Sequence, residues 1–168
     1  AHDGAVTDIS YHPAGTSLLT ASVEGTWKQW ALPLVPPLPL AGSTDAVSRV
    51  VMAADGSLMV VGGLDKTVRI FNSQNGQLLR ALAGHTDAVT ALALDLPGQL
   101  VVSGSEMGAI RLWNPADGVS KLELLGHDGA VLDLELLPAA AGIVSAGADG
   151  TIRRWLLPQP PRDHAGHT

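Results

Sequence analysis

The sequence predicts an all-β fold made of four repeated units, and two markers with one fixed spacing support this. An aromatic residue recurs at intervals of 41, 42 and 42 residues, at Trp30, Phe71, Trp113 and Trp155. A polar residue recurs at the same intervals and always 28 residues earlier, at His2, Ser43, His85 and His127. Two markers in one register indicate an internal repeat whose period is a single supersecondary unit.

Each unit is predicted to contain four short strands, and the third unit shows the pattern most clearly. Its turns at 96–98, 106–108 and 114–118 contain Gly, Pro, Asn and Asp. Short apolar or alternating segments between such turns are typical of antiparallel strands joined by hairpins. The strands expected in this unit are Val89–Leu94, Leu100–Ser103, Ala109–Trp113 and Ser120–Leu125.

The other three units follow the same outline. The first unit is expected to form strands at Val6–Tyr11, Ser17–Ala21, Thr26–Ala31 and near Leu38–Ala41. The second unit is expected to form them at Val47–Met52, Leu58–Val61, Thr67–Phe71 and Gln77–Ala83. The fourth unit is expected to form them at Val131–Leu136, Gly142–Ser145, Thr151–Leu156 and near Arg162–Ala165.

Four strands in every unit of about 40–45 residues match one blade of a β-propeller. A lone sheet of this kind leaves both faces uncovered, whereas stacked blades bury each other. We therefore expect a single domain over 1–168, with blades at about 1–42, 43–83, 84–125 and 126–168.

The composition excludes several functional classes. The net charge of −6 repels phosphate groups, so we expect no nucleic-acid binding. No apolar run approaches the roughly 20 residues that span a bilayer, so we expect no membrane association. The absence of Cys excludes disulfides and thiolate zinc sites. The chain begins at Ala1 without a signal segment, which indicates a piece of a longer protein or a processed product and leaves the compartment unknown.

Gly-His pairs recur at Gly84-His85, Gly126-His127 and Gly166-His167, and a Trp lies at or next to the end of three of the four third strands. With these features, the segments 84–114 and 126–156 resemble the WD40 repeat family, and the resemblance covers essentially the whole chain. It implies a buried tetrad in each blade: a His before the first strand, a Ser or Thr on the second, an Asp in the following turn and the Trp. Buried polar groups need partners, and these four share hydrogen bonds.

Carried over to this sequence, the tetrad is complete only in the fourth unit, as His127, Ser145, Asp149 and Trp155. The first unit has His2, Thr20, Glu24 and Trp30, with Glu in place of Asp. The third unit has His85, Ser103 and Trp113, and Met107 stands where the acid belongs. The second unit has Ser43, Val61, Asp65 and Phe71, so we expect its network to be largely missing and its stability to depend on apolar packing.

The resemblance also implies a partner-binding face, made of the turns between second and third strands and the loops before the first strands. On this face we expect Val23, Leu64, Glu106 and Ala148, with Asp3, Thr44, Thr86 and Asp128 nearby. Interface anchors are enriched in Trp, Tyr and Arg, and this set contains none. A weakly bound partner, anchors on other blades and a purely structural role all remain open.

Four other patterns are explained better by structure than by chemistry. Ser, His and Asp recur at tetrad spacing, whereas a catalytic triad occurs once and needs an exposed nucleophile. Prolines over 31–40 and 158–161 suit edge strands rather than a polyproline ligand. His164 and His167 lack a third ligand, so we expect no metal site. A repeated basic position fits solvated or ion-paired side chains rather than a phosphate-binding stripe; it holds Lys28, Arg69, Arg111 and Arg153.

The sequence therefore favours a non-catalytic scaffold that binds a protein or peptide of unknown identity, without a cofactor. A purely structural repeat segment of a large multidomain protein is the alternative, and a propeller enzyme is the least favoured. Members of the resembling family typically form rings of seven or eight blades, and four blades alone would expose two apolar end faces. We expect half of an eight-bladed propeller, closed as a homodimer or by further blades of the parent chain.

Overall fold

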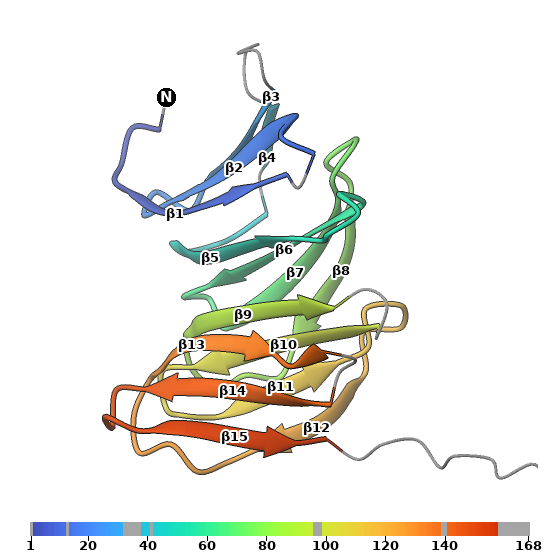
Figure 1. The fold of residues 1–168 in the computed structure, drawn as a ribbon. Coiled ribbons are helices and arrows are strands. Elements are labelled where there is room, and N and C mark those ends of the chain that lie inside the picture. Colours follow the sequence, from blue (N-terminus) through green and yellow to red (C-terminus); the bar gives the residue numbers. More distant parts are fainter. Residues whose placement is uncertain are drawn as a thin grey trace, which may run out of the picture.

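Four antiparallel sheets stacked side by side form the molecule (Figure 1). This computed structural model describes residues 2–12, 14–31, 38–40, 42–95, 99–138 and 141–157. The predicted all-β architecture of stacked antiparallel blades is confirmed. The stack is open, because the first and the last sheet lie at opposite ends of it (Figure 1).

Each sheet is one blade, and the strands of a blade pair in chain order. Blade one contains β1 (Val6–Tyr11), β2 (Ser17–Ser22), β3 (Trp27–Ala31) and β4 (Leu38–Leu40). Blade two contains β5 (Val47–Met52), β6 (Leu58–Gly63), β7 (Thr67–Asn72) and β8 (Leu78–Ala83). Blade three contains β9 (Val89–Asp95), β10 (Leu100–Ser105), β11 (Ile110–Trp113) and β12 (Ser120–Leu124). Blade four contains β13 (Val131–Leu136), β14 (Gly142–Gly147) and β15 (Ile152–Leu156). The strand expected near Arg162–Ala165 lies outside the described residues, as do the prolines at 158–161 and most of those over 31–40.

A bulge in the first strand of each blade links neighbouring blades. The pairing of first and second strands skips the second residue of each first strand: Thr7, Ser48, Thr90 and Leu132. A bulge re-aims the side chain that it carries. The first three side chains donate a hydrogen bond to a carbonyl oxygen of the next blade, at Val47, Val89 and Val131. The same hydroxyl contact therefore recurs at all three junctions within the chain.

The hydrophobic core lies between blades rather than inside any one of them. Three clusters of buried side chains fill the junctions between blades one and two, two and three, and three and four. Trp27 of blade one packs on Phe71 of blade two, with ring centroids 4.4 Å apart. Because burial of a large apolar side chain contributes roughly 1.5–3 kcal/mol, these junctions supply most of the apolar stabilisation.

Small residues on the second strands let the first-strand valines enter the junctions. A Cβ at Gly62 would lie 2.7 Å from Val89 Cγ1, and one at Gly104 would lie 2.6 Å from Val131 Cβ. Both valines are fully buried. Neither glycine has a left-handed backbone, so close packing rather than conformation explains why glycine is needed.

We expect Gly104→Ala to lower the free energy of unfolding by about 1–3 kcal/mol, because the new methyl group overpacks the junction against Val131. Gly129→Ala is the matched control, since a Cβ there meets nothing closer than 3.5 Å. Its effect should stay within about 0.5 kcal/mol. Urea unfolding measures both variants, and equal stabilities would contradict a tightly packed junction.

Candidate functional site

Blade four contains an unbroken chain of hydrogen bonds through the four tetrad residues, from the Trp to the acid. This chain is called the circuit below. Trp155 Nε1 donates to Ser145 Oγ at 2.8 Å, and Ser145 Oγ lies 2.7 Å from His127 Nε2. With Nε2 accepting the hydroxyl proton, His127 Nδ1–H donates to Asp149 Oδ2 at 2.9 Å. Burial opposes ionisation of Asp149, but the Thr151 N–H and the His127 ring hold the pKa of this carboxyl well below its usual range. The carboxylate is thus fixed as an acceptor.

The burial of this circuit argues against nucleophilic catalysis. Ser145 is 1% exposed and His127 is 5% exposed. A nucleophile must reach its substrate, and the Ser145 hydroxyl is enclosed between an indole and an imidazole. The Ser, His and Asp of blade four therefore form an internal contact of the blade.

Blade one forms the same circuit with a longer acid. Trp30 Nε1 lies 2.9 Å from Thr20 Oγ1, which lies 2.7 Å from His2 Nε2. His2 Nδ1 lies 2.8 Å from Glu24 Oε1. Hydrogen bonds from the Thr26 hydroxyl and from His2 lower the pKa of Glu24 to about 2. Glu in place of Asp therefore still closes the circuit.

Blade three forms two of the three hydrogen bonds of the circuit. Trp113 Nε1 donates to Ser103 Oγ at 2.8 Å, and His85 Nε2 lies 2.7 Å from the same hydroxyl. His85 Nδ1 is buried and has no hydrogen-bond partner in the described part of the chain. Met107, at the acid's position, is 74% exposed. Burial and the nearby Arg111 charge lower the pKa of His85 to about 4.

An acid still ties the two loops of blade three, but it comes from the opposite loop. In the other blades the acid of the turn accepts a backbone N–H from the loop before the first strand: Glu24 from Asp3, Asp65 from Thr44, and Asp149 from Asp128. In blade three, Asp87 of that loop accepts the N–H of Met107 in the turn at 3.0 Å. Although burial opposes it, the Met107 N–H and the Thr86 hydroxyl lower the pKa of Asp87.

The residue two positions before the acid limits which acid can reach the histidine. In blade four it is Gly147, where a Cβ would lie 2.5 Å from Asp149 Oδ1. Blade three has Ser105 at this position, and Ser105 is fully buried. A side chain at 105 would crowd an Asp at 107 in the same way, and the chain has Met at 107 instead. Blade one also has Ser here, and its acid is the longer Glu24.

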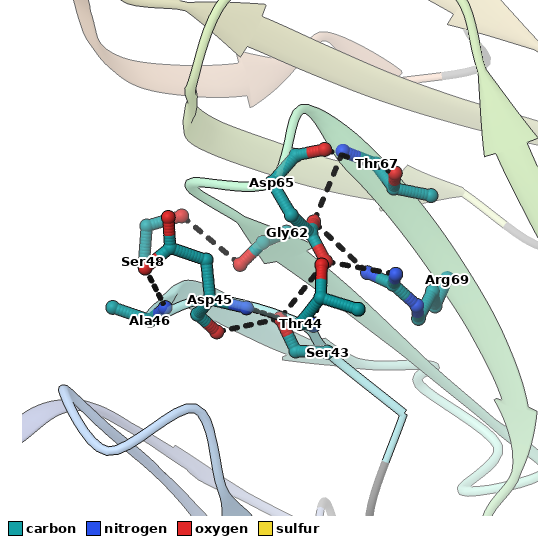
Figure 2. A network of polar contacts seen from close by, with 9 residues as sticks. All are labelled: Ser43, Thr44, Asp45, Ala46, Ser48, Gly62, Asp65, Thr67 and Arg69. Atoms are coloured by element: carbon teal, nitrogen blue, oxygen red, sulfur yellow. Dashed lines mark hydrogen bonds and ion pairs between the residues drawn. The ribbon is translucent and has the colours of Figure 1, made fainter.

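Blade two replaces the tetrad with a network around Asp65 (Figure 2). Asp65 Oδ2 accepts from Ser43 Oγ at 3.2 Å and from Thr44 Oγ1 at 3.1 Å, and it pairs with Arg69 at 2.8 Å. Burial opposes ionisation, but Arg69 and Thr44 lower the pKa of Asp65 to about 2. The sequence predicted a largely missing network. The His, the second-strand Ser and the Trp are absent from their positions in blade two, but Arg69 and Thr44 supply Asp65 with other partners. Phe71 packs in place of the Trp.

The arginines of the repeated basic position lie in ion pairs. Arg69 pairs with Asp65, Arg111 with Glu123 at 2.7 Å, and Arg153 approaches Asp149 at 3.9 Å. These arginines neutralise acids of their own blade.

The turn face is the name used here for the loops at one end of the strands. It comprises 2–5, 23–26, 42–46, 64–66, 84–88, 106–109, 126–130 and 148–151. All eight residues predicted for a partner-binding face are exposed: Val23, Leu64, Glu106, Ala148, Asp3, Thr44, Thr86 and Asp128. A groove crosses this face between blades two and three, and it brings Leu64 and Glu106 together. Its lining is Leu64, Lys66, Asp87, Ala88, Thr90 and Glu106.

Sequence reasoning missed two side chains of the turn face. Met107 is the most exposed large apolar side chain on it. The absence of the usual acid at position 107 was the feature of the sequence that could have pointed to it. Lys66 lines the groove and has a φ of 66°, where the other blades have Gly25, Gly108 and Gly150. A lysine in the left-handed region is uncommon. In the sequence, the only sign of it is that Lys66 stands where the other three units have Gly.

The turn face is strongly acidic. Eight of the 16 Asp and Glu residues of the chain lie on it: Asp3, Glu24, Asp45, Asp65, Asp87, Glu106, Asp128 and Asp149. Lys66 is the one Lys or Arg in these loops. The charge of this face is therefore predominantly negative.

A second groove lies at the opposite end of the strands, between the same two blades. Leu58, Leu79 and Pro115 line it together with Arg80. Arg80 already donates to the Ala116 carbonyl at 2.8 Å, so its charge faces the protein.

Neither a metal cluster nor a membrane helix emerges from the described residues. No three His, Asp or Glu side chains among them are grouped closely enough to hold a metal ion. Within the same residues there is no helix long and apolar enough to cross a membrane. His164 and His167 lie outside the described residues.

Comparison with known families gives a match over most of the chain. The family described as "WD domain, G-beta repeat" matches residues 1–31, 36–72, 76–114 and 118–155. No curated protein matches the sequence.

Solved structures share the fold along almost the whole chain. The structure of U3-55K has a TM-score of 0.86 and 27% identity, over 94% of this chain and 50% of that one. The RRP9 WD40 repeats have a TM-score of 0.85 and 26% identity, over 92% and 49%. The computationally designed Ika4 protein has a TM-score of 0.84 and 27% identity, over 94% of both chains. The chain thus spans about half the length of the U3-55K and RRP9 chains and nearly all of the Ika4 chain.

A double substitution, Ser105→Gly with Met107→Asp, is expected to complete the circuit of blade three. Met107→Asp alone places a carboxylate against Ser105, and Ser105→Gly alone only removes a buried side chain. Together they let a carboxylate accept the His85 Nδ1–H near Arg111. We expect a favourable coupling of about 1–2 kcal/mol between the two changes in the free energy of unfolding. Denaturant unfolding of the wild type, the two single variants and the double variant measures this coupling. If the effects of the two substitutions add to within about 0.5 kcal/mol, the predicted contact does not form.

The lowered pKa of His85 predicts a loss of stability on mild acidification. The folded chain holds this ring neutral down to about pH 4, whereas the unfolded chain protonates it near pH 6.5. Its contribution is therefore complete above about pH 6.5 and is lost as pH falls toward 4. Between pH 7 and 5 we expect a loss on the order of 1 kcal/mol, measured by urea unfolding at one protein concentration. The Ser105→Gly, Met107→Asp variant should show a smaller loss, and an unchanged slope would contradict the assignment to His85.

Proposed function

The chain belongs to the WD40 repeat family, and we propose that it is a non-catalytic scaffold that holds a protein or peptide on its turn face. The groove between blades two and three carries this proposal. It combines an apolar wall at Leu64 with the carboxyl groups of Asp87 and Glu106. In the described residues the Glu106 side chain forms no hydrogen bond or ion pair, so its charge is available to a ligand.

The chemistry of the turn face selects the kind of partner. Its acids outnumber Lys66, and exposed Leu64 and Met107 offer apolar contact near the groove. Methionine adapts to different partner shapes. A basic peptide segment with an aliphatic side chain beside its Lys or Arg fits this combination. Lys66 would repel a misplaced positive charge and so would contribute to specificity.

The proposal that the chain is not an enzyme is supported by where its reactive groups lie. The hydroxyls of Thr20, Ser103 and Ser145 are buried in contact with an indole and an imidazole. The strongly shifted acids Glu24, Asp65 and Asp149 are fixed by backbone hydrogen bonds from the facing loop of their own blade. Perturbed groups with structural partners are not evidence of catalysis.

We further propose that the scaffold acts as a closed ring of eight blades. Either a second copy or further blades of a longer chain could supply the other four. The similarity to nearly the whole Ika4 chain supports the view that four blades are a sufficient folding unit.

Selection of short linear peptides on the immobilised chain tests the binding proposal. We expect enrichment of Lys and Arg next to an aliphatic residue, and NMR shifts centred on Leu64, Glu106 and Met107. Glu106→Lys and Leu64→Ser should each weaken binding at least about tenfold. Leu79→Ser, in the opposite groove, is the matched control and should bind normally.

Two results would count against this proposal. Shifts centred on Leu79 and Arg80 would move the binding site to the opposite face. Failure to select any peptide would favour the alternative, a purely structural repeat segment.

A further inference from the structure

The three junctions inside the chain define what a covered blade face looks like. Each blade has a forward face, which packs on the next blade, and a backward face, which packs on the preceding one. The forward face contributes a small second-strand residue and an apolar third-strand residue. The backward face contributes the first-strand valine and the third-strand aromatic ring. Blade one lacks a neighbour on its backward face, and blade four lacks one on its forward face.

The backward face of blade one carries the complete set of junction residues, but they are exposed. Val6 is 48% exposed, whereas the corresponding Val47, Val89 and Val131 are 0% exposed. Ile9 is 56% exposed, and its counterparts in the other three blades are at most 6% exposed: Val50, Leu92 and Leu134. The backward face of blade one therefore has the residues of a buried junction without a neighbouring blade to cover them.

The forward face of blade four carries the other half of a junction. Ile152 is 78% exposed, whereas its counterparts in the other blades are 0% exposed: Trp27, Val68 and Ile110. Ala146 continues the series of small residues formed by Ala21, Gly62 and Gly104. Ala146 pairs with Ile152 across β14 and β15, so both side chains lie on the same face. Blade four therefore presents the socket that Val6 of blade one would fill.

We propose that a second copy of this chain covers both end faces, so that blade four of each copy packs on blade one of the other. This inference rests on the eight-bladed ring proposed above and names its other half. Blade one needs a forward face to pack against, and blade four needs a backward face. The opposite end of a second copy has the required face in each case. Two such junctions related by a two-fold axis leave no blade face uncovered.

One pair of residues makes these two ends specific for each other. At the internal junctions, a third-strand residue of one blade shares a cluster with the aromatic residue of the next blade. Ile70 does so with Trp113, and Leu112 does so with Trp155. The corresponding pair at the closing junction is Arg154 and Trp30 of the second copy. Trp30 is held by its bond to Thr20, and a guanidinium stacks favourably on a fixed indole face. An aliphatic side chain at 154 would lack this contact.

The closing junction also differs from the internal ones in its bulge. Leu132 stands where Thr7, Ser48 and Thr90 donate a hydroxyl hydrogen bond to the next blade. Leu132 is 49% exposed and can add only apolar contact. The closing junction therefore lacks the hydroxyl hydrogen bond that recurs at the three internal junctions.

Light scattering after size exclusion tests the proposal on the 168-residue chain. We expect a mass of twice 17.3 kDa. Val6→Asp and Ile152→Asp each place a carboxylate in the closing junction and should reduce the mass to a single chain. Val119→Asp is the matched control, because Val119 is 59% exposed but lies in blade three, away from both ends. It should leave the mass at twice 17.3 kDa.

Mixing the two end variants separates specific pairing from general loss of association. A ring of one Val6→Asp chain and one Ile152→Asp chain keeps one junction intact, so the mass should return to that of two chains. A monomeric wild-type chain, a larger assembly, or a dimer insensitive to both substitutions would overturn the inference. Peptide binding in the groove needs only blades two and three, so its success or failure is a separate result.

Discussion

The contact between the first strand of one blade and the second strand of the preceding blade is the constraint on which the structure depends. A propeller blade has two apolar faces, and in the described residues only another blade covers them. The bulge directs Thr7, Ser48 and Thr90 toward the next blade, and the valine beside the bulge enters a space left by a small residue. The hydrogen bond from the bulge and the packing of the neighbouring valine therefore both fix the distance between adjacent blades. Blades cannot shift independently, so stability belongs to the stack rather than to its members.

The polar networks are a second level that holds the loops once the blades are stacked. What the loops need is one carboxylate that accepts a backbone N–H from the facing loop, and either loop can provide it. Glu24, Asp65 and Asp149 lie in the turn, whereas Asp87 lies in the loop before the first strand. The histidine is less essential, because blade two dispenses with it and uses Arg69 as the partner of its acid. This explains why departures from the tetrad change individual blades without changing the fold.

The repeat markers predicted most strand positions to within one or two residues, because alternation and turn residues are local properties. The tetrad residues of blades one and four were implied by the resemblance to WD40 repeats, and residues at equivalent positions of one repeat face equivalent neighbours. The relocated acid could not be predicted, because Asp87 and Met107 meet only when two loops are brought together. The Asp65 network was missed for the same reason. The crowding between Ser105 and an acid at 107 depends on atomic distances that no sequence pattern records.

The departures from the repeat are not spread evenly, and this bears on function. Blades one and four close their circuits and carry the open end faces, whereas blades two and three give up parts of theirs and flank the groove. Met107 is free to point outward because it makes no circuit, and Lys66 lines the groove in an unfavourable backbone conformation. Positions that break local rules are where functional sites are expected. The proposed two-fold ring would carry two such grooves. A partner with two basic segments would gain affinity from linkage alone, so a groove without aromatic anchors is sufficient for a scaffold.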